Sequence, residues 1–262
     1  MLLEGFELWV PPVPEEYEDG MPVYEIIGTD AQIVQFPLRP NRKIHCFAGA
    51  MAYMSDGIDM EVKLGTVGKT FGRIAGGGSL FEVTYTNNSG KDGYIAMTPD
   101  YPGVIVPIDM RVTSKIVAVR DSYLCSAVGF GESMTDISAG FNPANSVGGF
   151  CCSGFDFIVQ TLENGHWVFL MAMGTVVKKT LQAGEKILVD GDSLLCFETT
   201  VSVDVRAVGN LSVICCACEG IFNTQLTGPG TIWMQSLSID KMRRLFPPEQ
   251  QSSGGDSGGD SG

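Results

Sequence analysis

Apolar and polar residues alternate along several short stretches of this chain. Residues 58–64, 81–86 and 201–206 each carry Ile, Met, Val, Leu, Phe or Tyr at every second position. Alternation with a period of two is typical of β-strands that bury one face. Asn164-Gly165 and Ser89-Gly90 are typical of the tight turns that join antiparallel strands. The pattern therefore predicts an all-β protein built from half-buried antiparallel strands.

One stretch, from Ser238 to Phe246, has helical spacing instead. Ser238 can cap the first turn, Ile239 and Met242 fall on one face, and Pro247 ends the run. We predict a short C-terminal helix that covers one end of the β body. A helix that binds a partner is the alternative that the pattern leaves open.

A weak threefold repeat organises the strands. A Gly228-Pro229-Gly230 turn leads into an alternating strand up to Leu237, and similar arrangements occur twice upstream. We predict a single β domain, residues 23–248, made of units at about 23–112, 113–178 and 179–246. Before it lies an acidic, Pro-rich extension at residues 1–22, in which Phe6, Leu8 and Trp9 could pack against the body. After it lies a Gly/Ser/Asp tail at 249–262, whose composition is typical of disorder.

Composition supports many short strands over helices. The 262 residues include 33 Gly and 13 Pro, and only 18% are charged, whereas helices favour Ala, Glu, Lys and Arg on exposed faces. No apolar run approaches the length of about 20 residues that a membrane-spanning helix needs. The N-terminus has neither the basic start of a signal peptide nor the Arg-rich character of a transit peptide. We therefore expect a cytoplasmic or mitochondrial protein without a transmembrane segment.

The net charge of −13 comes mainly from the two ends of the chain. Residues 1–38 hold eight acids and no Lys or Arg, and the tail adds three acids, so residues 39–248 are almost neutral. Such ends are typically solvated. No basic stripe is present to neutralise phosphates, which excludes nucleic acid as an expected partner.

Sequence patterns for catalysis are weak. Gly68-Lys69-Thr70 resembles the end of a phosphate-binding loop, but Lys63 stands where that loop needs its first glycine. His45 and His166 are the two histidines, and neither has a carboxylate beside it in sequence. Asp190-Gly191-Asp192 fits a turn better than an ion site. We therefore predict no catalytic, cofactor-binding or metal-binding residues, and no enzyme.

The eight cysteines leave one chemical alternative open. They are Cys46, Cys125, Cys151, Cys152, Cys196, Cys215, Cys216 and Cys218. If the repeats bring the 151–152 and 215–218 groups together, their thiolates could bind zinc or form a redox switch. Only one pair, Cys215 and Cys218, has the Cys-x-x-Cys spacing. Adjacent cysteines in a strand point to opposite faces, and unpaired cysteine is among the most buried residue types, so packing is the favoured interpretation.

Three segments resemble a known family: Ile26 to Val34, Ala48 to Glu61, and Thr227 to Leu237. They are similar to the mitochondrial biogenesis (altered inheritance of mitochondria) family of tryptophan RNA-binding attenuator-like (TRAP-like) β proteins. The resemblance covers about residues 24–246. It implies three short double-stranded β-helix-like units, with ring or trimer assembly, and for some eukaryotic members a link to the mitochondrial inner membrane. It supplies no catalytic residues, and the RNA-binding rim of the namesake proteins has no match here.

Taken together, the sequence predicts a non-enzymatic scaffold or interaction protein that associates with itself or with protein partners. The alternative is a small-ligand or metal/redox-binding protein that uses a pocket between β units with the cysteine groups.

Overall fold

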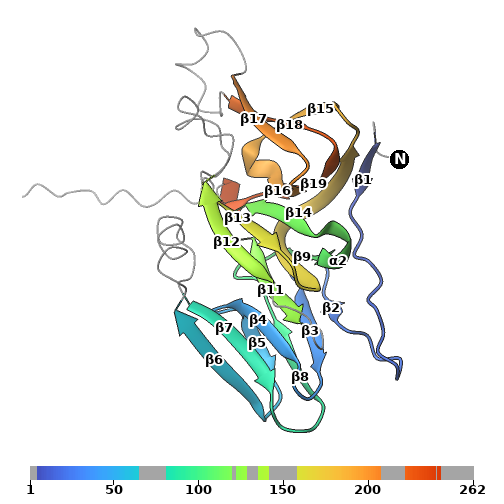
Figure 1. Ribbon diagram of the computed structural model, residues 1–262, viewed down its shortest axis with the longest axis vertical. Coiled ribbons are helices and arrows are strands. Elements are labelled where there is room, and N and C mark those ends of the chain that lie inside the picture. The colour runs from blue at the N-terminus through green and yellow to red at the C-terminus, as the bar shows by residue number, and fades with distance from the viewer. Residues whose placement is uncertain are drawn as a thin grey trace, which may run out of the picture.

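The computed structural model describes residues 5–64, 81–119, 122–128, 135–141, 158–207, 222–239 and 241–242. These residues form an all-β fold, as the alternation predicts, and every pairing between strands is antiparallel. The helical elements that lie wholly within these ranges are a single turn, α2 (Met110–Thr113), and a 3-10 turn, η2 (Gly191–Ser193). Residues 239, 241 and 242 are also helical, where the sequence predicts the start of the C-terminal helix. Figure 1 shows the strands between residues 33 and 97, coloured blue to teal, in the lower part of the molecule and orange strands at the top.

The strands build four layers, which we number from the lower part upward. Layer 1 has the order β2 (Glu25–Ile27), β3 (Ile33–Leu38), β8 (Gly93–Met97) and β5 (Met51–Met54). Layer 2 has the order β9 (Val104–Asp109), the first part of β14 (Trp167–Leu181), β11 (Tyr123–Val128), β4 (Lys43–Phe47), β7 (Phe81–Asn87) and β6 (Ile58–Leu64).

Layer 3 contains the second part of the same strand β14. Its order is β1 (Phe6–Leu8), β14, β19 (Gly230–Leu237), β16 (Leu194–Glu198), β10 (Lys115–Val119), β13 (Ile158–Glu163) and β12 (Asp136–Phe141). Layer 4 has the order β15 (Lys186–Val189), β18 (Phe222–Thr227) and β17 (Ser202–Ala207). Strand β14 is therefore a member of two sheets.

Three apolar cores lie between the four layers. Core 1 joins layers 1 and 2, core 2 joins layers 2 and 3, and core 3 joins layers 3 and 4. The burial of β14 on both faces explains why its sequence has no polar face. Trp167, Phe169 and Met171 enter core 1, whereas Val168 and Leu170, with Ala172, enter core 2. A strand buried on both faces is a continuous apolar run rather than an alternating one.

The two parts of β14 meet at a bulge between Met173 and Val176. Gly174 has a φ of +70°, which glycine adopts at little cost. The side chains of β19 satisfy the N–H groups that the bulge leaves outside the ladder. Met173 N donates to Gln235 Oε1 and Thr175 N donates to Ser236 Oγ, both at 3.0 Å.

The local signals in the sequence have structural counterparts. Asn164 and Gly165 both have positive φ, 61° and 85°, as a two-residue hairpin turn requires. Ser238 Oγ accepts a hydrogen bond from Lys241 N at 3.1 Å, which matches the predicted cap, and residues 243–246 lie outside the described part of the chain. In β19, Trp233 enters core 2 whereas Ile232 enters core 3, so the predicted opposite faces are confirmed.

Candidate interaction surface

The N-terminal arm, residues 5–24, crosses the outside of the layers and is fixed at several points. Phe6 packs against core 3 and Trp9 against core 2, while Leu8 is 58% exposed. Residues 15–23 fold back on themselves, because Tyr17 N donates to Met21 O at 2.8 Å and Val23 N to Glu15 O at 2.7 Å. The sequence predicts an extension here, and the structure adds that its acids pair with the body.

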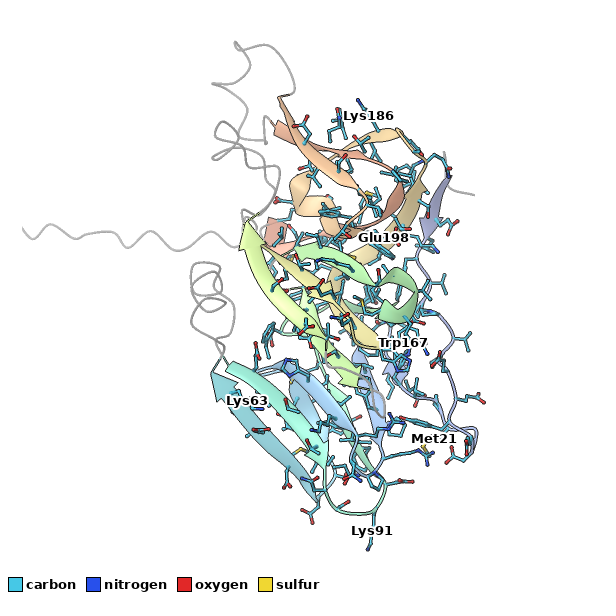
Figure 2. The ribbon with its side chains drawn as sticks, viewed as in Figure 1. Met21, Lys63, Lys91, Trp167, Lys186 and Glu198 are labelled. Atoms are coloured by element: carbon cyan, nitrogen blue, oxygen red, sulfur yellow. The ribbon has the colours of Figure 1, made fainter. Side chains whose placement is uncertain are left out.

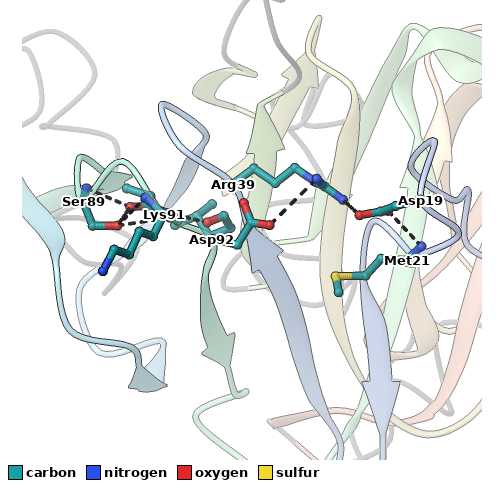
Figure 3. A network of polar contacts seen from close by, with 8 residues as sticks. Asp19, Met21, Arg39, Ser89, Lys91 and Asp92 are labelled. Carbon is teal, nitrogen blue, oxygen red and sulfur yellow. Dashed lines mark hydrogen bonds and ion pairs between the residues drawn. The ribbon is translucent and has the colours of Figure 1, made fainter.

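Arg39, just after β3, is the first anchor of the arm (Figure 3). Its guanidinium forms an ion pair with Asp19 and stacks on the Tyr17 ring at 4.4 Å from the ring centre. Asp92 Oδ2 lies 3.9 Å from Arg39 Nη1 on the other side. The hydrogen bond from Arg39 holds the pKa of Asp19 below its ordinary value, and the Met21 backbone N–H adds to the effect. Arg39 therefore ties the arm to layer 1.

Arg111 is the second anchor. It donates to Glu15 and, at 2.7 Å, to Asp109 Oδ2, and His166 Nε2 lies 3.4 Å from Glu15 Oε2. Burial alone would raise the pKa of Asp109, but the hydrogen bonds from Arg111 outweigh it and lower that pKa. Charge-assisted bonds of this kind are stronger than neutral ones. The folded-back segment is thus held at its start, through Glu15, and at its turn, through Asp19.

A groove of about 340 Å³ lies between the arm and the outer face of layer 1. Its apolar lining is Met21, Pro22, Pro37, Gly93 and Tyr94, and its polar lining is Glu25, Gln35, Arg39 and Asp92. Arg39 faces both Asp19 and Asp92, and with Glu25 the carboxylates outnumber this one positive charge, which leaves the groove acidic. Its volume is at the lower end of the range for small-molecule sites.

Exposed aromatic side chains continue the groove across layer 1. Tyr94 is 48% exposed and Tyr53 is 40% exposed, and their rings lie 6.3 Å apart edge to face. Tyr53 Oη donates to Gln35 Oε1 at 2.9 Å. Gln35 and Tyr53 are the register partners of Ala96 on its two sides, so this bond passes over Ala96 and leaves it fully buried. Together with Met21, which is 45% exposed, these residues form what we call the aromatic face.

The sequence did not indicate this surface. Tyr17 and Arg39 are far apart in the chain, and no short motif joins them. The only available signal was the group of acids in the first 38 residues without a Lys or Arg. Three of them use basic residues of the body as partners: Glu7, Glu15 and Asp19.

The described cysteines are placed for packing. Cys46 and Cys125 are register partners in β4 and β11, and Cys196 lies in β16. All three are unbridged and no more than 1% exposed. Burial raises the pKa of Cys46 to about 12 and raises the pKa values of the other two thiols as well, which disfavours the reactive thiolate. Cys151, Cys152, Cys215, Cys216 and Cys218 lie outside the described residues.

The other candidate residues that the structure describes make contacts within the fold. His45 is buried in β4 with Nδ1 at 3.3 Å from Thr84 Oγ1. Asp190 caps η2 through Asp192 N and pairs with Lys241 at 3.0 Å. Gly68-Lys69-Thr70 falls outside the described ranges. Within those ranges, no three His, Cys, Asp or Glu side chains gather as a metal site would require.

Comparison with known proteins adds the family. The family model for mitochondrial biogenesis AIM24 matches residues 24–237. The chain belongs to this family. In the described parts of the chain, no helix has the length and apolar character needed to cross a membrane.

Two streptococcal proteins are similar to the chain. An uncharacterised protein of Streptococcus pyogenes serotype M6 is 23% identical over 228 residues, which cover 82% of this chain and 87% of that protein. A crystal structure of a Streptococcus pyogenes protein matches with a TM-score of 0.65 at 19% identity, covering 85% of this chain and 97% of that one. At this identity the likeness concerns the fold alone.

Proposed function

We propose that this chain is a non-enzymatic interaction protein, a scaffold whose aromatic face and acidic groove bind a segment of a protein partner. The observation that carries the proposal is the exposure of Tyr94, Tyr53 and Met21 around a groove on a rigid sheet. Exposed aromatic side chains beside a pocket are typical of protein-binding surfaces. Core 1 supports the opposite face of layer 1, so the surface is held in place before binding.

The charges of the groove favour a basic partner. Arg39 is shared between Asp19 and Asp92, so these groups and Glu25 leave a net negative charge at the groove. Tyr94 offers a ring against which a cation can lie. A groove of about 340 Å³ accommodates one or two side chains rather than a folded domain. We therefore expect a segment that presents Lys or Arg next to an apolar side chain.

The finer features of the family prediction belong to the same proposal. These are three TRAP-like double-stranded β-helix-like units, assembly of several copies, and a cytoplasmic or mitochondrial location. Their support is the family match and the layered antiparallel sheets.

A small ligand in the same groove is the second candidate, because the volume suits one. The cysteine-based form of this alternative gains no support from the described thiols. Cys46, Cys125 and Cys196 lie in cores 1 and 2 and do not line the groove.

A peptide panel tests the proposal. Labelled peptides that combine Lys or Arg with Leu, Phe or Tyr are titrated with the protein, and binding is followed by fluorescence anisotropy. We expect salt-sensitive binding that the substitution Tyr94→Ala removes and Leu188→Ala leaves unchanged, since Leu188 is similarly exposed on layer 4. Equal binding by both variants, or no binding by any peptide, would contradict the proposal.

A further inference from the structure

Strand β6 forms one end of layer 2, and in the described part of the chain one of its edges is unpaired. It has seven residues and pairs with β7 through its whole length. Among the described residues, no strand pairs with its other edge. An edge strand offers a row of backbone N–H and C=O groups to any strand that can reach it. Proteins usually block such edges with inward-pointing charges, short strands or bulges.

The inward-facing side chains of β6 are apolar rather than charged. Ile58 is buried in core 1, and the next two residues on its face, Met60 and Val62, are 58% and 48% exposed. Their register partners on β7, Tyr85 and Val83, are core 1 residues. Met60 and Val62 therefore extend the apolar inner face of layer 2 beyond the part of core 1 that is covered. Neither position carries the charge that would discourage pairing.

The opposite face of β6 carries charges of both signs. Glu61 and Lys63 are 63% and 67% exposed at the side chain and lie 3.3 Å apart. An exposed pair of this kind contributes little to stability and can exchange partners at low cost. Asp59 is already held by Asn88 Nδ2 at 2.7 Å. Glu61 and Lys63 are therefore the charges that a neighbouring strand would meet.

We propose that β6 pairs antiparallel with β6 of a second copy, with Val62 on the twofold axis. In that register Val62 meets Val62 on the inner face, and Glu61 of each copy lies opposite Lys63 of the other. A shift that centres the axis on Glu61 would place Asp59 opposite Lys63, but it would also bring two glutamates into contact on the axis. Opposite charges at facing positions stabilise a strand pair and like charges destabilise it, so the charges select the first register. The interface is isologous and closes as a dimer.

The dimer proposal and the proposed scaffold function both involve protein contacts, and this is all that they share. The dimer uses the edge of β6, which is separate from the groove. Figure 2 shows Lys63 at the left of the lower half of the molecule and Met21 at the right. The groove beside Met21 therefore stays open when two β6 edges meet.

Charge reversal tests the register. Lys63→Glu or Glu61→Lys places like charges at both facing positions, whereas Glu61→Lys with Lys63→Glu restores two opposite pairs. We expect sedimentation velocity and light scattering of the wild type to give twice the mass of one chain as concentration rises. Each single reversal should raise the dimer dissociation constant about tenfold or more, and the double reversal should restore it. Val62→Lys should abolish the dimer, because it places two like charges on the axis.

Lys186→Glu is the matched control, since it makes the same charge change on β15, the edge strand of layer 4, and should leave the dimer intact. Circular dichroism confirms that each variant folds. A wild type with the mass of one chain or of three, or a double reversal that does not restore association, would overturn the proposal. The peptide titration separates the two functions: Lys63→Glu should keep peptide binding, and Tyr94→Ala should keep the dimer.

Discussion

Gly174, at the bend of β14, should tolerate alanine poorly for two separate reasons. Its φ of +70° costs an L-residue about 1–2 kcal/mol. An added Cβ would also lie 2.3 Å from Ser236 Oγ. That oxygen accepts the hydrogen bond from Thr175 N, and displacing it forfeits about 0.5–1.5 kcal/mol. We expect Gly174→Ala to lower the free energy of unfolding by about 2–3 kcal/mol.

Gly184 supplies a matched control. Its φ of +77° is nearly the same, but an added Cβ would meet nothing within 4 Å. Gly184→Ala should therefore show the backbone cost alone, about 1 kcal/mol less than Gly174→Ala. In a chain of this size that difference corresponds to about 2–4 °C in Tm.

Urea unfolding followed by circular dichroism measures these costs, provided that the m-value stays constant. Ser236→Ala removes the oxygen that clashes, so the double variant should be destabilised less than the sum of the two single variants. Equal costs for Gly174→Ala and Gly184→Ala, or strict additivity with Ser236→Ala, would refute this account of the bend.

Three further outcomes are expected. Phe169→Ala, which empties the space between two edge-to-face ring contacts in core 1, should cost about 3–5 kcal/mol in urea unfolding, and a cost below about 1 kcal/mol would contradict the packing. Arg39→Gln should raise the pKa of Asp19 in an NMR titration. Since that pKa is lowered in the fold, the contribution of Asp19 to holding the arm is complete above the ordinary value of 3.8 and is lost as pH falls through the lowered value. Burial raises the pKa of Cys46 from 9.0 to about 12, so the stability that the neutral thiol contributes is present below pH 9 and is lost as pH rises toward 12. The urea midpoint should therefore fall over that interval, and it should fall less in Cys46→Ala.

Strands with one solvated face could be predicted from the sequence, and those buried on both faces could not. Residues 58–64 alternate and coincide with β6, and residues 81–86 lie within β7. In β14, by contrast, successive side chains enter two cores, so the apolar run carries no information about which side chain belongs to which core.

The surface was harder to foresee than the strands. Arg39 binds Asp19 and stacks on Tyr17 only because the arm folds back against layer 1, which is a tertiary arrangement. At the edge of β6 the sequence is misleading, because Met60 and Val62 follow a regular alternation that predicts burial, whereas both are exposed. Their exposure depends on how far layer 1 extends over layer 2, and local sequence does not encode that distance.

The double membership of β14 limits where recombination can divide a gene for this fold. The boundary predicted between the second and third units, at residues 178 and 179, falls inside β14. A recombination event at that point would cut a strand that pairs with β9 and β11 along one part and with β1 and β19 along the other. A descendant divided there would need a new strand to join its sheets. Change of loop length is the easier evolutionary route, because it leaves the shared strand whole.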